Sequence, residues 1–502
     1  MTNRRIFFNA ASSVGTVIAV SIILFVLYRY LLITIGVARL GVWSLVLAAT
    51  SLTQVANFGL SGSVVKYVAK YVAVGRLDEV SSIIQTAAIS VAGFIGVVLM
   101  AGYPLAQWLL RIVVPAGALP EALSILPLAF LTFWFMAISS VFLAGLDGFQ
   151  RILVKNLLLT GGSVFYLVLC FVLTPKLGLK GVALARVAQD LSLLISGWIL
   201  LKTRLRELPL IPHSWTPRAF REIIVYGVNF QIISFMTLCY DPLTKALLSK
   251  FGGLSSVGYY EMASRMVQQL RSLIVSANQV LVPAIADLQE RLPDRIRTVY
   301  RTSCHLTYYL ALPMYSMSIL ALPLVSRVWI GRVEREFVLF GVLLCAGWFF
   351  NTLNCPAYFA NLGMGELKWN VIGHVAIALL NLALGLWLGH RFAGIGVIGG
   401  WAVALTAGSS LILISYHFRH RIPFSEIFPP SSLALTGVSI VSIFAFFFIM
   451  WFRVLPKDPV SLSALILLAF FAAILLPLWR NPMRRRLIGW IVDDMAGGRQ
   501  ET

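Results

Sequence analysis

Four charged side chains lie within long apolar stretches of this sequence: Arg29, Asp241, Lys245 and Arg271. A charge at the centre of a lipid bilayer costs at least about 2.5–3.5 kcal/mol on insertion scales, so such residues usually face a cavity or a partner of opposite charge. Arginine in particular suits a phosphate group, because its planar guanidinium donates two hydrogen bonds to neighbouring oxygens. We therefore expect these four residues to line a cleft that binds an anionic ligand.

Two of these residues have an alternative placement. Arg29 lies about two turns from the end of its apolar stretch, between two tyrosines, which also suits an aromatic belt from which the guanidinium snorkels to the headgroups. Lys245 is similarly shallow. Asp241 and Arg271 are deeper, and we expect neither to have a partner at helical spacing, so they are the stronger candidates for the cleft.

Side-chain amides in the same apolar stretches are candidates for contacts with sugar hydroxyl groups. The commoner role of such amides is a hydrogen bond between neighbouring transmembrane helices, and the sequence leaves both roles open. The four amides are Gln54, Asn57, Gln268 and Gln269.

Two further pairs of intramembrane charges have the spacing of ion pairs along one helix face. Arg186 and Asp190 are four residues apart, and so are Glu261 and Arg265. Residues at this spacing are neighbours on the surface of a helix. We expect both pairs to be structural ion pairs rather than ligand-binding groups.

Other motifs do not indicate a cofactor or a metal. The glycine pattern at 394–399 matches a dinucleotide fingerprint, but no strand precedes it, and close helix packing explains its glycines. His417 and His420 stand beside arginines, which disfavour a bound cation. No Walker motif is present, so direct use of ATP is not expected. The cysteines are scattered through apolar runs as small core residues, at Cys170, Cys239, Cys304, Cys345 and Cys355.

The elements that must position the candidate residues are transmembrane helices. Of the 502 residues, 59% are hydrophobic and only 12% are charged, against about 45–50% apolar and about 25% charged in soluble domains. The apolar runs have about twenty residues, the length that crosses about 30 Å of hydrocarbon. The sequence predicts an all-α polytopic membrane protein with about fourteen transmembrane helices. These are 14–35, 41–65, 80–103, 121–146, 153–174, 179–201, 222–249, 257–286, 302–326, 337–362, 369–389, 394–417, 431–452 and 460–479.

Two polar links divide the chain, one near residues 202–221 and one near 418–430. They indicate an N-terminal lobe (1–218), a C-terminal lobe (219–420) and a last pair of helices with a basic tail (421–502). Lysine and arginine are roughly twice as frequent in the loops on the side of the N-terminus, so both termini are expected in the cytoplasm. Membrane insertion and attraction to anionic lipid explain the net charge of +20 without nucleic acid as a partner.

An internal repeat relates the two lobes. The first two matched pairs are offset by 217 residues, and the third slips by one or two. Because each half has an even number of helices, the halves insert in the same orientation and form two parallel six-helix repeats, an arrangement that usually encloses a central substrate site. With this offset, Arg29 and Lys245 occupy nearly equivalent places. The matched segments are 36–43 with 253–260, the turn at Arg151 with the turn at Lys368, and 178–181 with 394–396.

Several segments resemble a known family. They are Leu40-Gly-Val-Trp-Ser-Leu-Val, Asn57-Phe-Gly-Leu-Ser-Gly-Ser, Val257-Gly-Tyr-Tyr-Glu-Met-Ala with Pro283-Ala-Ile-Ala, and Asn361-Leu-Gly-Met-Gly-Glu-Leu-Lys-Trp-Asn with Gly394-Ile-Gly-Val. Together they are similar to the bacterial O-antigen and polysaccharide flippases, a branch of the multidrug/oligosaccharidyl-lipid/polysaccharide flippase superfamily. The resemblance extends over about residues 1–420. Asn57 departs from it, because many relatives have an acidic residue there, and this argues against a coupling role for Asn57.

The resemblance implies a flippase that performs no covalent chemistry. Such a protein moves an undecaprenyl-diphosphate-linked oligosaccharide from the inner to the outer leaflet of the bacterial cytoplasmic (inner) membrane by alternating access, for cell-surface polysaccharides such as lipopolysaccharide O-antigen or exopolysaccharide. The implied partners are the polyprenyl-diphosphate-linked glycan, membrane lipid, and a polysaccharide polymerase or glycosyltransferase. No cofactor and no metal are implied.

Three alternatives remain open. A cation-coupled multidrug exporter on the same fold needs buried carboxylates, and Asp241 is the residue that supports this alternative. A peptidoglycan-precursor flippase also has fourteen helices, but the segment characteristic of its first two helices is not recognisable here. A membrane scaffold for polymerases or glycosyltransferases fits least, because the sequence has no large polar loop for docking.

Overall fold

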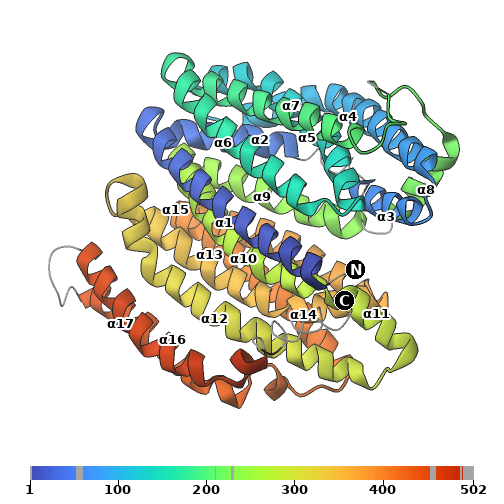
Figure 1. The fold of residues 1–502 in the computed structure, drawn as a ribbon. Coiled ribbons are helices and arrows are strands. Elements are labelled where there is room, and N and C mark those ends of the chain that lie inside the picture. Colours follow the sequence, from blue (N-terminus) through green and yellow to red (C-terminus); the bar gives the residue numbers. More distant parts are fainter. Residues whose placement is uncertain are drawn as a thin grey trace. The chain divides into compact units, whose positions relative to one another are not determined.

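The structure is a computed structural model that describes residues 3–51, 60–209, 211–227, 231–452, 459–486 and 489. Every regular element within these residues is helical, in agreement with the predicted fold class (Figure 1). The chain forms two compact units. The first is Arg5–Gly258, and the second is Tyr259–Thr502 together with the first four residues.

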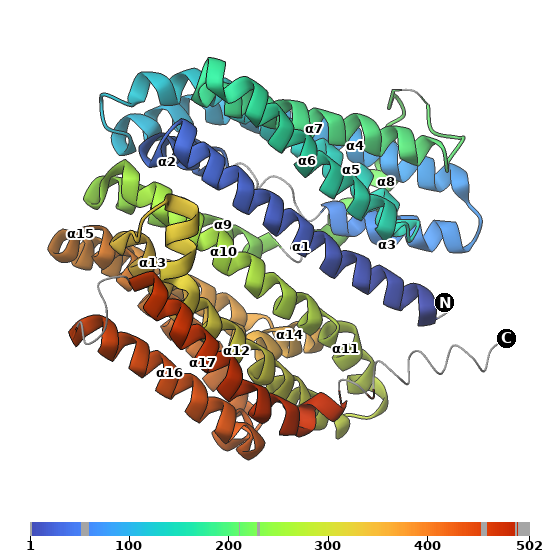
Figure 2. The same ribbon diagram turned by 60° about the vertical axis from the view of Figure 1, so that its left-hand side comes forward.

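The first unit is built around α5, which contacts α2, α3, α4 and α7. Pairs of long helices lie side by side along the unit, and α6 packs on α7 in all views (Figures 1 and 2). Helix α9 belongs to this unit, where it contacts α2 and α4. Its helices are α1 (Asn3–Thr34), α2 (Val37–Ser51), α3 (Leu60–Ala73), α4 (Leu77–Val113), α5 (Leu119–Gly148), α6 (Ile152–Leu177), α7 (Leu179–Lys202), α8 (Pro217–Gly227) and α9 (Gln231–Phe251).

The second unit is built around α12, which contacts α11, α13, α14, α16 and α17. Helix α10 begins within the first unit, at Gly253, and continues into the second. The helices are α10 (Gly253–Gln279), α11 (Leu281–Arg291), α12 (Arg295–Ile330), α13 (Arg335–Leu353), α14 (Cys355–Met364), α15 (Lys368–Arg419), the short η3 (Phe424–Glu426) and η4 (Pro430–Ser432), α16 (Leu433–Phe452) and α17 (Pro459–Arg480).

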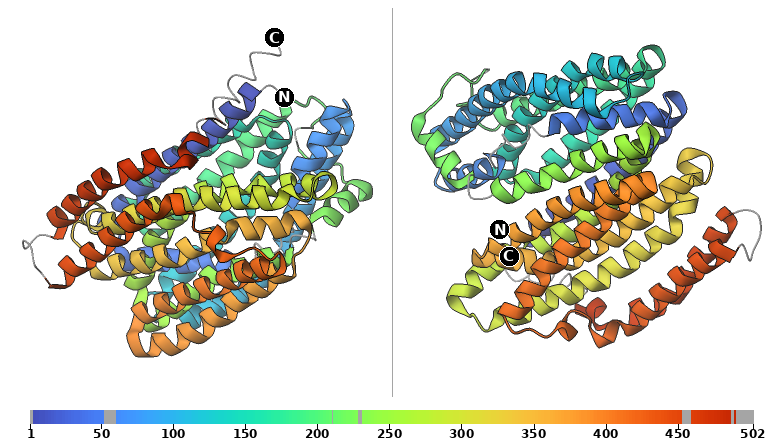
Figure 3. Two further views of the ribbon diagram at one scale, coloured as in Figure 1. Left: turned by 90° about the horizontal axis from the view of Figure 1, so that it is seen from below. Right: turned by 180° about the vertical axis from the view of Figure 1, so that it is seen from behind.

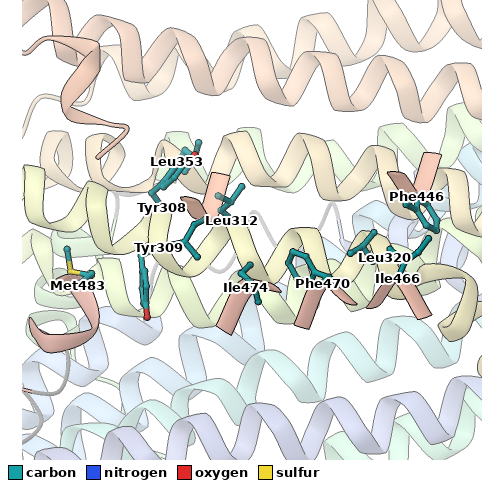
Figure 4. Packing of buried hydrophobic residues seen from close by; sticks show 11 residues of the cluster. Tyr308, Tyr309, Leu312, Leu320, Leu353, Phe446, Ile466, Phe470, Ile474 and Met483 are labelled. Atoms are coloured by element: carbon teal, nitrogen blue, oxygen red, sulfur yellow. The ribbon is translucent and has the colours of Figure 1, made fainter. Parts of the chain in front are cut away.

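The last two helices form a hairpin along one flank of α12 (Figure 3). The contact is a continuous apolar core, and Figure 4 shows side chains of α12 together with those of α16 and α17, with Leu353 of α13 and Met483, after α17, in the same cluster. Its centre holds Leu312 and Leu320 of α12 against Phe470 and Ile474 of α17. The hairpin is therefore an integral part of the second unit.

The structure divides several of the predicted helices. Predicted helix 257–286 is two helices, α10 and α11, and predicted helix 337–362 breaks before Pro356, which cannot donate a backbone hydrogen bond to the preceding turn. Predicted helices 369–389 and 394–417 appear as one element, α15, that is interrupted by non-helical backbone at Phe392 and Ala393. Within the described residues, ten helical stretches have the length and apolarity to cross a membrane, and α15 is counted among them once.

The predicted repeat is present in the backbone. Gly36, directly before α2, and Gly253, the first residue of α10, have the same left-handed conformation, at φ of 81° and 82°. A Cβ atom on Gly41 would overlap the carbonyl oxygen of Leu254, and a Cβ atom on Gly258 would overlap that of Val37. These two contacts are exchanged by the offset of 217 residues, as expected for a pseudo-twofold axis between the starts of α2 and α10.

The offset falls to 215 residues in the later part of each repeat. The turn between α6 and α7 at Gly178 (φ 55°, ψ −133°) has the conformation of the break in α15 at Ala393 (φ 51°, ψ −139°). The backbone nitrogen of Arg151 bonds to the oxygen of Leu146, as that of Glu366 bonds to the oxygen of Asn361. Arg151 is thus equivalent to Glu366 rather than to Lys368 as predicted from a constant offset.

Candidate functional site

Arg271 is held by two neutral groups from one other helix of the second unit, α13. Its Nε atom on α10 donates a hydrogen bond to Oδ1 of Asn351 on α13 at 3.1 Å. Its guanidinium carbon lies 4.6 Å from the ring centroid of Trp348, a cation–π contact. Among the described residues Arg271 forms no ion pair, so its positive charge is oriented by these contacts without being neutralised.

The partner of Arg271 is itself fixed. The side-chain nitrogen of Asn351 donates to the hydroxyl oxygen of Ser409 on α15 at 2.8 Å, and both residues are buried. His374 and Tyr358 lie next to each other in the same region, with ring centroids 5.7 Å apart. Contacts from α13, which is itself bonded to α15, therefore hold one half-buried arginine of α10 in place, which is the preorganisation that binding of an anion requires.

Asp241 and Lys245 form an ion pair on α9, with 2.5 Å between Oδ2 and Nζ. The side chain of Lys245 is only 4% exposed, whereas that of Asp241 is 41% exposed. The expectation that Asp241 lacks a partner at helical spacing is therefore wrong, because Lys245 is four residues further along the same helix face. The pair removes the net charge from this part of α9.

Arg29 differs from the other candidates, because its side chain is exposed on α1. Tyr28 beside it is buried, and the hydroxyl group of Tyr30 lies 3.4 Å from the carbonyl oxygen of Phe171 on α6. The tyrosines thus tie α1 to α6 and leave the guanidinium on the outside of the first unit. This geometry is compatible with both placements that the sequence leaves open.

Two of the four amide candidates lie within the described residues. Gln268 on α10 donates from Nε2 to the hydroxyl oxygen of Ser264 at 2.9 Å, within its own helix. Gln269 is half-buried on the same helix. Gln54 and Asn57 lie outside the described residues.

The two predicted structural pairs have the geometry of ion pairs. Arg186 and Asp190 on α7 are 3.1 Å apart, and the side chain of Asp190 is 2% exposed. Arg265 and Glu261 on α10 are 2.8 Å apart, with the carboxylate again buried. Both carboxylates are compensated within one helix.

The described residues contain no cluster of histidine, cysteine and acidic side chains that could hold a metal ion. His417 lies near the end of α15 and is buried. Its ring nitrogens lie 2.8 Å from the hydroxyl group of Tyr300 and 3.0 Å from the carbonyl oxygen of Ile422. Both nitrogens are thus occupied by structural hydrogen bonds.

An apolar cavity of about 320 Å³ lies between α2, α4 and α9 in the first unit. On α9 it is lined by Pro242, Leu243 and Ala246, which are neighbours in sequence of the Asp241–Lys245 pair. A second apolar cavity of about 530 Å³ lies between α4, α5 and α7, where Trp134 and Trp198 line it. Neither cavity has the polar lining that a glycan or a diphosphate would need.

The fold is that of membrane transporters of the MOP superfamily. An inward-facing multidrug-resistance MATE transporter of this superfamily matches with a TM-score of 0.68 at 16% identity, over 79% of this chain and 94% of that chain. The lipid II flippase MurJ in an inward closed conformation matches with a TM-score of 0.62 at 14% identity, over 94% of this chain and 99% of that chain. The likeness to both structures confirms the predicted fold class.

The chain belongs to the family described as "Polysaccharide biosynthesis protein", whose pattern it matches over residues 7–289. A protein of Shigella flexneri with the name "Putative O-antigen transporter" is 20% identical over 197 residues. That match covers 39% of this chain and spans slightly less than half, 46%, of the relative. The family agrees with the one that the sequence motifs resemble.

Proposed function

We propose that this protein is a flippase that moves an undecaprenyl-diphosphate-linked oligosaccharide from the inner to the outer leaflet of the bacterial cytoplasmic membrane by alternating access. Membership of the polysaccharide biosynthesis family carries the proposal. The likeness to a lipid II flippase and to a relative named for O-antigen transport supports it. The bound glycan would be destined for a cell-surface polysaccharide.

The physical task is to carry a diphosphate and a hydrophilic glycan across hydrocarbon. Neither group crosses unaided, because burying an unpaired charge in an apolar medium is prohibitively costly. Arg271 supplies a charge that the described residues do not neutralise, held by Asn351 and Trp348. A guanidinium in this setting replaces water around a phosphate oxygen, while the polyprenyl tail remains in lipid.

The multidrug exporter is the second candidate function, favoured by the half-exposed carboxylate of Asp241. An exporter that trades a cationic drug for a proton or sodium ion needs a carboxylate that is free to bind each in turn. Asp241 instead pairs with Lys245, and Asp190 and Glu261 pair with arginines. The paired carboxylates make this function the weaker proposal.

The test is the sidedness of lipid-linked glycan in membranes of a strain that lacks this protein. We expect undecaprenyl-linked oligosaccharide to accumulate on the inner leaflet and to be cleared when the wild-type chain is restored. Increased sensitivity to cationic drugs without any accumulated glycan would instead establish the exporter. The same membranes, solubilised mildly, would show whether a polymerase or a glycosyltransferase copurifies, as we propose for its partners.

The proposed orientation places both termini in the cytoplasm, in accord with the lysine and arginine bias. Arg332, between α12 and α13, is then periplasmic, and Arg421, after α15, is cytoplasmic. Both side chains are exposed, so cysteines at these positions report the orientation through labelling of intact cells. Labelling of position 332 alone supports the orientation, and labelling of position 421 alone reverses it.

A further inference from the structure

A polar pocket lies at the first turns of α12, apart from the candidate site around Arg271. Its volume is about 300 Å³. α12 contributes one stripe of side chains, the link before α16 contributes a carboxylate, and the segment after α17 contributes an arginine. The lining residues are Arg297, Thr298, Arg301, Thr302, His305, Glu426 and Arg486.

The α12 residues follow helical spacing, so they share one face over about two turns. This face begins near the amino-terminal end of a 36-residue helix, where the helix dipole also favours an anion. The Thr302 hydroxyl bonds to the backbone oxygen of Thr298, which leaves the guanidinium groups as the strongest donors in the pocket.

The walls of the pocket are held by specific contacts. Arg297 donates to the carboxylate of Glu426 at 2.6 Å, and the His305 ring lies 3.0 Å from the backbone oxygen of Glu426. One turn further along α12, the hydroxyl groups of Tyr308 and Thr436 lie 2.8 Å apart. These contacts join the link and the start of α16 to α12, so the pocket is part of the folded unit.

The charges of the pocket do not balance. Glu426 is the one carboxylate in the lining, and its pKa is lowered chiefly by the hydrogen bond from Arg297, so it stays ionised and occupies that arginine. Among the described residues, Arg301 and Arg486 form no ion pair. The pocket therefore has an excess of about two positive charges, and two guanidinium forks remain for a ligand.

Exposed apolar side chains in the link and at the start of α16 indicate a ligand that is anchored in lipid. Phe428, in the same link as Glu426, packs edge-on against Tyr308 and is 53% exposed. Leu433, at the start of α16, is 69% exposed. A soluble phosphate gains nothing from these side chains, whereas the acyl chains of a lipid whose headgroup lay in the pocket would cover them.

We propose that this pocket binds the phosphate of an anionic phospholipid, with Arg301 and Arg486 donating to its oxygens. The lysine and arginine bias places this end of α12 at the cytoplasmic leaflet, whose anionic lipids supply such headgroups. The lipid bridges α12 to the segment after α17 and thereby stabilises the α16–α17 hairpin. This function is independent of the cargo that the protein carries.

The experiment is a lipid titration of the purified full-length protein by native mass spectrometry, with phosphatidylglycerol compared with phosphatidylcholine. The double variant Arg301→Gln/Arg486→Gln removes the two guanidinium groups that are proposed to bind the phosphate. Arg295→Gln/Arg485→Gln is the matched control, because it removes the same charge from the same two segments outside the pocket lining. We expect about tenfold weaker binding of phosphatidylglycerol for the first variant and less than about twofold for the control.

Three results would overturn the proposal. They are an equal loss for both double variants, equal binding of both lipids by the wild type, and displacement of phosphatidylglycerol by millimolar inorganic phosphate, which would identify a site for free phosphate. Arg486→Gln alone covers the case in which the double variant does not fold, since Arg486 is exposed beyond the end of α17. Its expected loss is about threefold, accompanied by a lower melting temperature only when phosphatidylglycerol is present.

Discussion

Arg271 differs from the other charges inside the helices in the nature of its partners. Asp190, Asp241 and Glu261 are each compensated by a cation four residues away. Arg271 contacts an amide and an indole ring, neither of which carries a charge. A charge that is oriented but not compensated stabilises an anionic ligand more than a neutralised pair does, since no existing ion pair has to be broken.

The first prediction concerns Arg271 itself. Arg271→Ala should abolish clearance of lipid-linked glycan in the deletion strain, and Arg271→Lys should retain only part of it, because lysine keeps the charge but loses the planar fork. Arg391→Gln is the control, since Arg391 also lies over a tryptophan, Trp387, but is exposed near the break in α15. Full clearance by Arg271→Ala at wild-type abundance would exclude Arg271 from binding.

A second prediction tests the structural role of the Arg186–Asp190 pair. Arg186→Met should lower stability by about 3–5 kcal/mol, because it leaves the buried carboxylate of Asp190 without its cation. Arg186→Met/Asp190→Leu should recover most of that loss, since it removes both charges. The measurement is the melting temperature in detergent. If the double variant were no more stable than the single one, the pair would have a role beyond compensating Asp190.

Helical spacing predicts charge partners only within one helix. This spacing relates Arg186 to Asp190 and Glu261 to Arg265, and it relates Asp241 to Lys245 in the same way. The hydrogen-bond partner of Arg271 lies 80 residues away on another helix, so the spacing of the two residues in the sequence does not predict their contact. Asn351 lies in an apolar run like several other asparagines, so its residue type alone does not mark it as the partner of Arg271.

At the scale of elements, the starts of α2 and α10 depend on two glycines. Gly41→Ala or Gly258→Ala should each lower stability by about 2 kcal/mol or more, because the added methyl group overlaps a carbonyl oxygen of the opposite helix. Gly437→Ala in α16 is the control, with open space around the new atom, and should be neutral or slightly stabilising. Thermal unfolding of the three variants would test the contacts of Gly41 and Gly258 directly. Melting temperatures equal to that of the Gly437→Ala control would refute these contacts.

The break in α15 offers a prediction in the opposite direction. Ala393 has a backbone conformation (φ 51°, ψ −139°) that favours glycine, and the equivalent position of the first repeat is a glycine, Gly178. Ala393→Gly should therefore raise the melting temperature by relieving about 1–3 kcal/mol of strain, partly offset by the greater freedom of glycine in the unfolded chain. Gly178→Ala should lower it. A decrease for both variants would show that the two turns are not equivalent.

Helix breaks were harder to predict than helix positions. Apolar length locates a membrane-crossing segment, but it does not distinguish one helix from two that follow each other without a polar linker. The break between α13 and α14 lies within an apolar run, with Pro356 as its one sequence signal. The interruption at Phe392 and Ala393 has no proline, but it lies between the predicted helices 369–389 and 394–417, and its counterpart in the first repeat is the turn at Gly178.

At the scale of the whole molecule, composition and repetition together predicted the architecture. Composition required a membrane protein, and a constant offset between segments required two related halves. The third matched pair already showed a slip of one or two residues, but the start of this slip before Arg151 was not predictable, because two residues lost within a helical hairpin leave the apolar pattern unchanged. Within the described residues, ten apolar stretches have the length to cross a membrane, and α15 is counted among them once although it holds two of the predicted helices. The expected count of fourteen stays a prediction.

The last prediction follows from the charge of the proposed cargo. Outward movement of an anion is favoured by an inside-negative potential, by about 2.3 kcal/mol per charge per 100 mV, or about fortyfold per charge in the distribution between leaflets. In vesicles containing the purified protein and a fluorescent diphosphate-linked oligosaccharide, an imposed inside-negative potassium diffusion potential should accelerate outward movement, and reversing the potential should slow it. Vesicles that contain the Arg271→Ala variant are the control, because they report the spontaneous movement of the oligosaccharide. A transport rate that depended on neither the membrane potential nor the proton and sodium gradients would exclude an electrically driven flippase. A rate that depended on an ion gradient alone would require a counter-moving cation, and Asp241 is the first carboxylate to test as its binding site.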